Sequence, residues 1–187
     1  MTAVSGRVLL WSAVATVLLT AGSLVTVGLL TATDPSSARL GQPCAGPTST
    51  SGTVVNATLV NRGMRRAPMA GGMGAGAMRL ISDRATVQAG RVTFVATNTG
   101  TVSHELVILP LPRGELAGSR QIGDDGTVNE SASVGEASSS CAEGSGEGIL
   151  PGAIGWVTVT LRPGRYEIIC NLPGHYEAGM YAQITVT

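Results

Sequence analysis

Short runs of alternating apolar and polar residues, separated by turns rich in Gly and Pro, divide the chain from Thr53 to Thr187. Alternation with a period of two is typical of strands that bury one face. The clearest runs are residues 53–60, 91–97, 102–109, 156–161, 165–170 and 181–187. Together with the turns between them, they predict an all-β domain, a Greek-key β-sandwich of about eight strands with no long helix.

The composition supports a β domain and excludes one class of function. The chain has 187 residues, which is enough for one domain and an anchor. Its 26 Gly and its low aromatic content of 3% favour short strands and turns over a large helical core. Twelve Arg, with no Lys, balance twelve acidic residues, so the net charge of zero excludes a polybasic nucleic-acid binder.

Residues 8–33 contain no charged side chain. As a helix this run would be roughly 39 Å long, compared with about 30 Å for the hydrocarbon core of a bilayer. We therefore expect a single-pass transmembrane anchor in the cell membrane. Arg7 precedes the run and Asp34 follows it, so residues 1–7 are expected in the cytoplasm. A cleaved signal peptide is the alternative, and both place the rest of the chain on the extracytoplasmic side.

Residues 34–52 are rich in Pro, Ser, Thr and Gly, and we expect a flexible linker before a domain formed by residues 53–187. Two stretches inside this domain interrupt the alternation. Residues 62–79 combine Gly and Arg with four methionines: Met64, Met69, Met73 and Met78. Residues 114–152 are rich in Gly and Ser, and a loop of this length usually has a function or a covalent constraint.

Four side chains provide the strongest functional signal. Cys170, His175 and Met180 follow one another at intervals of five on one predicted loop, and the only other His, His104, lies near the start of the run 102–109. One thiolate, two imidazoles and a thioether are the donor set of a blue-copper site. Each residue taken alone is more often structural, but together they predict one copper ion. Zinc, the competing metal, usually takes more thiolates or a third imidazole in structural sites.

The same residues carry a resemblance to a known family. Residues 170–175, with the sequence CNLPGH, resemble the azurin-type ligand loop of the cupredoxins, and residues 98–106 are similar to the family's first-ligand segment. Over residues 53–187 the chain most resembles the sulfocyanin-like branch of these small blue copper proteins. The resemblance implies that the ligands of a type 1 copper ion are His104, Cys170, His175 and Met180.

Two further expectations come from this resemblance. In cupredoxins the second loop His reaches the surface through an apolar patch, which here would be rimmed by Leu172, Pro173, Ala178 and Gly179. Glu105 departs from the family pattern, because azurins and plastocyanins carry an Asn after the first His, where it braces the ligand loop. The hydrogen bonds around the thiolate, which influence the reduction potential, are therefore open at the level of sequence.

The number of His residues limits the function. With both His assigned to one metal, none remains for a second copper centre or for a Ser/His/Asp set, so we expect no enzyme but a carrier of single electrons. The expected partners are redox proteins, by family analogy a respiratory donor and a terminal oxidase, and the membrane through residues 8–33. Neither a nucleic acid nor a small-molecule substrate is expected.

Two other functions remain as alternatives. An extracytoplasmic copper chaperone or resistance protein would use the methionines of residues 64–78, because thioethers select Cu(I). A metal-free, immunoglobulin-like adhesion sandwich would not explain the spacing of the four candidate ligands.

Cys44 and Cys141 are left once Cys170 is assigned to the metal. An even pair in an oxidising compartment predicts a disulfide, which would fasten the long loop to the linker. Lipidation of Cys44 and an intermolecular bridge are the alternatives.

Overall fold

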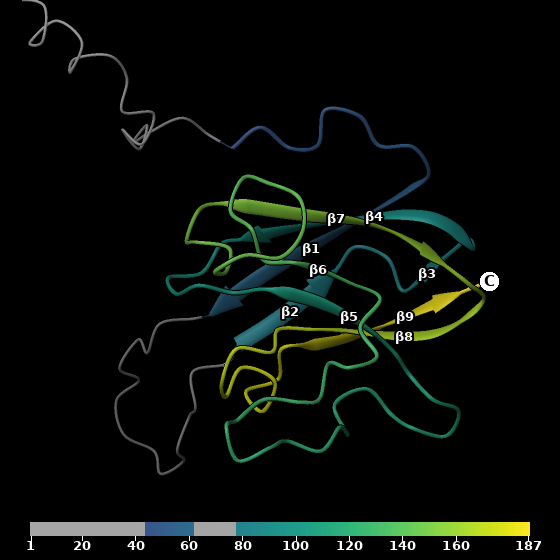
Figure 1. Ribbon diagram of the computed structural model, residues 1–187, viewed down its shortest axis with the longest axis vertical. Coiled ribbons are helices and arrows are strands. Elements are labelled where there is room, and N and C mark those ends of the chain that lie inside the picture. The colour runs from purple at the N-terminus through teal and green to yellow at the C-terminus, as the bar shows by residue number, and fades with distance from the viewer. Residues whose placement is uncertain (1–43, 62–77) are drawn as a thin grey trace, which may run out of the picture. The chain divides into compact units, whose positions relative to one another are not determined.

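The computed structural model describes residues 44–61 and 78–187, and this part of the chain forms nine strands (Figure 1). The strands are β1 Thr53–Asn61, β2 Met78–Ser82, β3 Thr86–Val87, β4 Gly90–Asn98, β5 Leu106–Pro110, β6 Gly135–Ala137, β7 Ile154–Leu161, β8 Gly164–Ile169 and β9 Tyr181–Val186. One sheet has the order β2-β1-β4-β7 and the other the order β3-β9-β8-β5-β6. Neighbouring strands are antiparallel, except that β1 pairs with β4 and β3 with β9 in parallel.

The two sheets pack against each other around the main hydrophobic core. Contacts of β6 with β7 and of β2 with β9 join the sheets at both sides. The all-β sandwich predicted from the alternating sequence is therefore confirmed, with nine strands in the described residues where about eight were expected.

The first sheet buries one face, as a period of two requires. In β1, Val55, Ala57 and Leu59 are buried, whereas Asn56 is exposed. Phe94 of β4 lies opposite Val55 in the same sheet and is also fully buried. Each such apolar side chain contributes about 1.5–3 kcal/mol to folding by leaving water.

The centre of the second sheet is buried on both faces. Every residue from Leu106 to Leu109 in β5 and from Tyr166 to Ile169 in β8 is buried. One face contributes to the main core, and the other contributes to a second cluster that includes Val128 and Tyr176. Both of these residues come from connections outside the strands, so a loop layer covers the outer face of this sheet.

The observed strands differ from the predicted ones in two respects. The short strands β2, β3 and β6 have too few residues to show a periodic pattern. The predicted strand at 102–109 begins only at Leu106, because Val102 is exposed and His104 instead makes an isolated bridge with Ile149. In this bridge the His104 N–H donates to the Ile149 carbonyl at 3.1 Å and the Ile149 N–H donates back at 2.7 Å.

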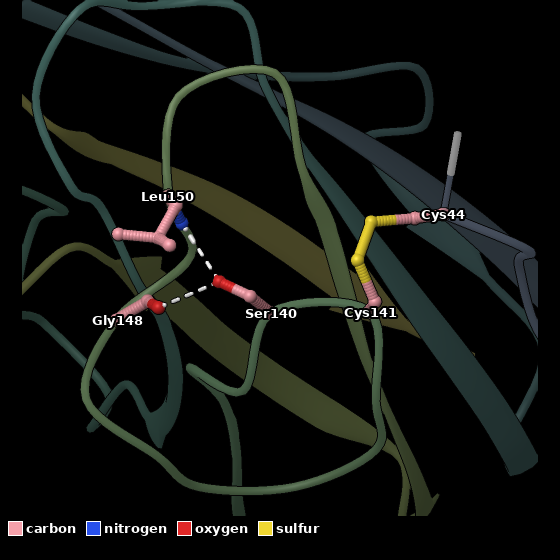
Figure 2. The surroundings of a disulfide bond; sticks show 5 residues. All are labelled: Cys44, Ser140, Cys141, Gly148 and Leu150. Carbon is pink, nitrogen blue, oxygen red and sulfur yellow. Dashed lines mark hydrogen bonds between the residues drawn. A yellow bond between two sulfur atoms is a disulfide. The ribbon is translucent and has the colours of Figure 1, made fainter. Parts of the chain in front are cut away.

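The Gly- and Ser-rich stretch 114–152 is tied to the sandwich at several points. It contains β6, and a disulfide joins Cys141 to Cys44 with the Cα atoms 5.0 Å apart, which confirms the predicted pairing (Figure 2). Beside the disulfide, the Ser140 hydroxyl donates to the Gly148 carbonyl at 3.0 Å and accepts the Leu150 N–H at 2.9 Å. The covalent constraint expected for so long a loop is therefore present.

The predicted membrane span at 8–33, residues 1–7 and most of the linker lie outside the described residues, as do Met64, Met69 and Met73. Within residues 44–61 and 78–187, no helix has the length and apolar character to cross a membrane. Met78 is the one candidate thioether of the Met-rich stretch inside this range, and it packs against the main core. Its side chain thus has a structural role at the start of β2.

Candidate metal centre

Three of the four predicted ligands come together from three parts of the chain. His104 lies between β4 and β5, Cys170 directly follows β8, and His175 lies in the turn between β8 and β9. The potential ligand atoms of these residues all lie within 4.8 Å of one another. The Cys170 Sγ is 3.2 Å from His175 Nδ1 and 3.9 Å from His104 Nδ1, and the two Nδ1 atoms are 3.2 Å apart. One thiol and two imidazole nitrogens therefore converge on a single point.

Burial keeps both imidazoles neutral. Desolvation, followed by the nearby His175 charge, lowers the pKa of His104 from 6.5 to about 4. Desolvation also lowers the pKa of His175. At neutral pH each ring therefore has one nitrogen lone pair that can bind a metal.

Burial has the opposite effect on the thiol. Desolvation raises the pKa of Cys170 to about 12, the charge of Glu105 adds to this, and the backbone N–H groups of Glu105 and Leu172 act against it. The thiol is thus protonated in the metal-free protein. A metal ion that binds here must displace this proton, so its affinity rises with pH.

Asn61, the last residue of β1, orients the His104 ring through its Nε2 atom. Its Oδ1 lies 3.2 Å from His104 Nε2, and it also accepts the Thr101 N–H at 2.8 Å. Because Oδ1 can only accept, Nε2 carries the proton and the Nδ1 lone pair faces Cys170. Gly100 makes room for this contact, since a Cβ at that position would collide with Asn61 Oδ1.

Glu105 forms the hydrogen bonds that the sequence left open. Its backbone N–H donates to Cys170 Sγ at 3.4 Å, and its carboxylate accepts the Asn171 N–H at 3.0 Å. The Glu105 side chain therefore links the first-ligand segment to the ligand loop, although it is a carboxylate and not an amide. Sequence reasoning recognised the departure from the family pattern but not this contact.

Met180 lies at the end of the ligand loop and is fully buried in the main core with Cys170. The Cys170 N–H donates to the Met180 carbonyl at 3.0 Å, and the Met180 N–H donates to the His175 carbonyl at 3.2 Å. These two backbone hydrogen bonds close the loop, so the three loop residues that were predicted as ligands are held by one turn.

One of the three converging residues reaches solvent. His104 and Cys170 are buried, whereas His175 is half-buried. Around His175, Pro173 is exposed, and the other predicted rim residues are half-buried: Leu172, Ala178 and Gly179. The His175 edge is therefore the shortest route between the site and the surface.

Residues that support the site from a distance were missed at the level of sequence. Asn61 is 43 positions from His104, and Val128 is 43 positions from Asn171, to which it is hydrogen bonded. Neither residue belongs to a motif, and we find no local signal that could have identified them.

The donor set fits copper. A thiolate and two imidazoles, the donors that converge here, belong to the set that accommodates both Cu(II) and Cu(I). The buried surroundings and the single partly exposed imidazole suit a buried ion that exchanges electrons through the surface. The described residues contain this one group of three His, Cys or acidic side chains that could hold a metal.

Three solved structures illustrate what the chain is similar to. A reduced auracyanin from the photosynthetic bacterium Roseiflexus castenholzii is 20% identical, with a TM-score of 0.45 over 74% of this chain and 99% of that one. Reduced rusticyanin is 18% identical, with a TM-score of 0.42 over 74% and 82%. Auracyanin A, a blue copper protein from Chloroflexus aurantiacus, is 17% identical, with a TM-score of 0.42 over 72% and 99%. No curated protein sequence matches the chain.

The model of the sulfocyanin (SoxE) domain matches residues 69–187, which is more than half of the chain. This range contains β2 to β9 and all four predicted ligands. The chain therefore belongs to the sulfocyanin family of cupredoxins, with a single type 1 copper site at the group His104, Cys170 and His175.

Proposed function

We propose that this protein is a membrane-anchored electron carrier of a respiratory chain, with its copper domain on the extracytoplasmic side. The observation that supports this best is the convergence of one buried thiol and two neutral imidazoles within 4.8 Å of one another. Copper bound there supplies a one-electron Cu(II)/Cu(I) couple.

The four ligands of the proposal are His104, Cys170, His175 and Met180. Three donors come from one short loop closed by backbone hydrogen bonds, and the fourth comes from a segment held by Asn61 and by the Ile149 bridge. A scaffold of this kind keeps the donors in place in both oxidation states. Little reorganisation is then required when an electron arrives or leaves.

A carrier fits the residue inventory better than an enzyme does. The whole chain contains two His, and the site uses both. No imidazole is left to build a second copper centre where a substrate could bind. The family match and the metal group also argue against a metal-free adhesion module.

Electrons would pass through the edge of His175, the half-buried ligand. The exposed and half-buried residues around it form a small surface, which suits partners that must dissociate quickly. We propose a respiratory donor and a terminal oxidase as these partners. An anchor at residues 8–33 would raise the effective concentration of the carrier near membrane-bound partners.

The test is the visible absorption spectrum of the chain after addition of Cu(II). We expect an intense blue band from charge transfer between Cys170 and copper, which disappears on reduction and is absent from Cys170→Ser. The matched control is the double variant Cys44→Ser/Cys141→Ser, which removes the other two Cys and should keep the band. A colourless protein that binds Cu(I) through residues 64–78 would refute the carrier and favour the chaperone.

A further inference from the structure

The outer face of the sheet β3-β9-β8-β5-β6 carries a second hydrophobic cluster, separate from the main core. Val107 and Leu109 of β5 and Ile169 of β8 point into it, and Val128 and Tyr176 complete it from two loops. Val128 belongs to the β5–β6 connection, whereas Tyr176 belongs to the ligand loop, directly after His175. The cluster therefore joins a polar surface connection to the loop that provides three predicted copper ligands.

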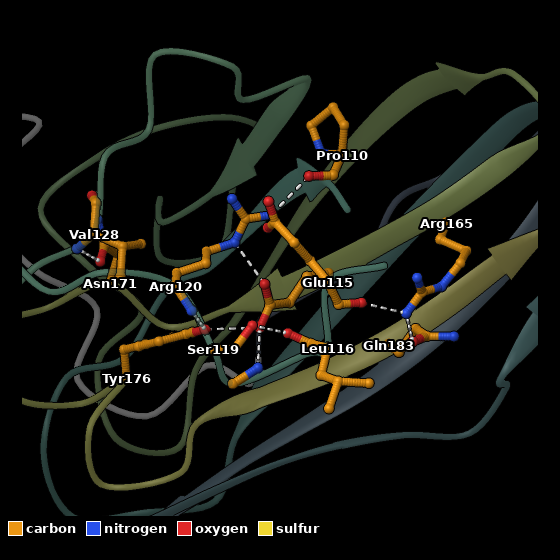
Figure 3. Close-up of polar contacts among 12 residues, drawn as sticks. Pro110, Glu115, Leu116, Ser119, Arg120, Val128, Arg165, Asn171, Tyr176 and Gln183 are labelled. Carbon is orange, nitrogen blue, oxygen red and sulfur yellow. Dashed lines mark hydrogen bonds and ion pairs between the residues drawn. The ribbon is translucent and has the colours of Figure 1, made fainter. Parts of the chain in front are cut away.

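An ion pair between Arg120 and Glu167 joins this connection to the sheet (Figure 3). Glu167 of β8 is 0% exposed, and its carboxylate accepts the Arg120 Nε–H at 2.5 Å and the Gly118 N–H at 2.7 Å. Arg120 also donates from Nη2 to the Pro110 carbonyl at 2.7 Å. Glu167 is completely buried whereas Arg120 is partly exposed, so loss of the Arg120 side chain would leave the Glu167 charge buried without its ion-pair partner.

The same ion pair reaches the ligand loop through Tyr176. The Tyr176 hydroxyl donates to Glu167 Oε1 at 3.0 Å and accepts the Arg120 N–H at 3.1 Å, while its side chain is 2% exposed (Figure 3). The hydroxyl therefore joins the ligand loop to both members of the Arg120–Glu167 pair.

Two further contacts hold the ligand loop to the same connection. The Asn171 side chain accepts the Val128 N–H at 2.7 Å and donates to the Val128 carbonyl at 2.9 Å. The Gly174 N–H donates to the Gly126 carbonyl at 3.0 Å. The connection thus contacts the ligand loop at Asn171 and Gly174, before His175, and at Tyr176, directly after it.

We propose that residues 118–130, named here the brace, are a positioning element for the copper-ligand loop and that Tyr176 is its main positioning residue. The inference rests on the proposed function and deepens it. Tyr176 is not one of the predicted ligands: it acts through His175, its neighbour in the chain, by fixing the loop to the Arg120–Glu167 pair. The brace also gives a role to part of the long Gly- and Ser-rich loop, which the copper ligands themselves do not use.

The discriminating variant is Tyr176→Phe, which keeps the ring in the cluster and removes only the hydroxyl. Tyr181→Phe is the matched control, because its ring packs on Tyr176 with centroids 5.3 Å apart but no hydrogen bond of its hydroxyl occurs among the described residues. Hydrogen exchange is followed in the metal-free protein at the amides of Ala178 and Met180, which donate to Gly174 and His175. The amide of Val157 in β7, remote from the brace, is the reference.

We expect exchange at Ala178 and Met180 to accelerate about tenfold or more in Tyr176→Phe, with Val157 unchanged, because a hydrogen bond to a charged group is lost. Tyr181→Phe should exchange like the wild type. Unchanged exchange at Ala178 and Met180 overturns the proposal. An equal acceleration at Val157 also overturns it, because the hydroxyl would then stabilise the whole domain and not the loop.

A second readout uses the copper-loaded protein. Tyr176→Phe should release copper to a chelator about tenfold faster than Tyr181→Phe and shift the maximum of the blue band. Identical release and spectra in the two variants would count against a positioning role. If the wild type forms no blue site, the proposed function fails, whereas the exchange experiment on the metal-free protein still decides the role of the brace.

Discussion

The Glu105 carboxyl makes the stability of the metal-free protein depend on pH. It is 9% exposed and lies between the first-ligand segment and the ligand loop. Burial raises its pKa from 4.5 to about 7, the charges of Glu136 and Glu130 add to the rise, and the Asn171 N–H acts against it. Folding therefore makes this carboxyl harder to ionise.

Because folding raises the pKa of Glu105, ionisation of this carboxyl destabilises the folded state. Below pH 4.5 the carboxyl is protonated in the folded and unfolded states, and its burial has no ionic cost. As the pH rises from 4.5 through about 7, the unfolded state loses its proton first, so the free energy of unfolding falls. The loss of stability is complete above pH 7. It amounts to about 3 kcal/mol, because each unit of pKa shift corresponds to about 1.36 kcal/mol.

His104 has the opposite effect in nearly the same window. Its pKa falls from 6.5 to about 4 on folding, so the unfolded state binds the extra proton and stability increases as the pH rises through this range. The contributions of Glu105 and His104 oppose each other in the wild-type curve, and the lowered pKa of His175 adds to the contribution of His104. The difference between the wild type and a Glu105 variant isolates the carboxyl.

We therefore predict the behaviour of Glu105→Gln, whose amide oxygen can still accept the Asn171 N–H. Urea denaturation of the metal-free protein should give equal free energies of unfolding for variant and wild type at pH 4. At pH 8 the variant should be more stable by about 3 kcal/mol. Glu177→Gln, which removes an exposed carboxyl of the ligand loop, is the matched control. A constant difference at all pH values, or none at pH 8, would refute the reasoning.

Two other changes test the covalent and polar supports. The double variant Cys44→Ser/Cys141→Ser opens a disulfide with a sequence separation of 97, and urea denaturation should show a loss of about 4–5 kcal/mol by the loop-entropy estimate. A reductant should destabilise the metal-free wild type by a similar amount and leave the double variant unchanged. Equal stability of the double variant and the wild type without reductant would contradict this prediction. Asn61→Ala frees His104 Nε2, so competition with a chelator should show copper affinity lower by about tenfold or more. Thr101→Val, which removes only the neighbouring hydroxyl contact, is its control, and equal losses in both variants would show that His104 is oriented by other means.

Much of the fold and the centre of the site could be predicted from local sequence. The alternation in β1 and β7 is visible because one face of each strand meets the core and the other meets water or polar groups. Cys170, His175 and Met180 lie within one loop, so their spacing predicts three of the four donors. Their scarcity helped as well, since the chain has only two His to place.

Other features depend on contacts that no local pattern encodes. The residues of β5 are buried on both faces because a distant connection covers the outer face, which removes the expected alternation. His104 lies in a bridge and not in a strand because Ile149, far along the chain, takes its backbone hydrogen bonds. Glu105 replaces a bracing amide only because its carboxylate reaches the Asn171 N–H.

The class of fold, the metal and three converging donors (His104, Cys170 and His175) could thus be predicted from the chain alone, largely because strand periodicity and loop spacing are properties of neighbouring residues. Only the tertiary structure decided how those ligands are supported. Asn61, Tyr176 and the Arg120–Glu167 pair act across 43, 56 and 47 positions of the chain, and burial gives these contacts their strength. A hydrogen bond or charge contributes most where water is excluded, and water is excluded only after the sheets and loops have packed.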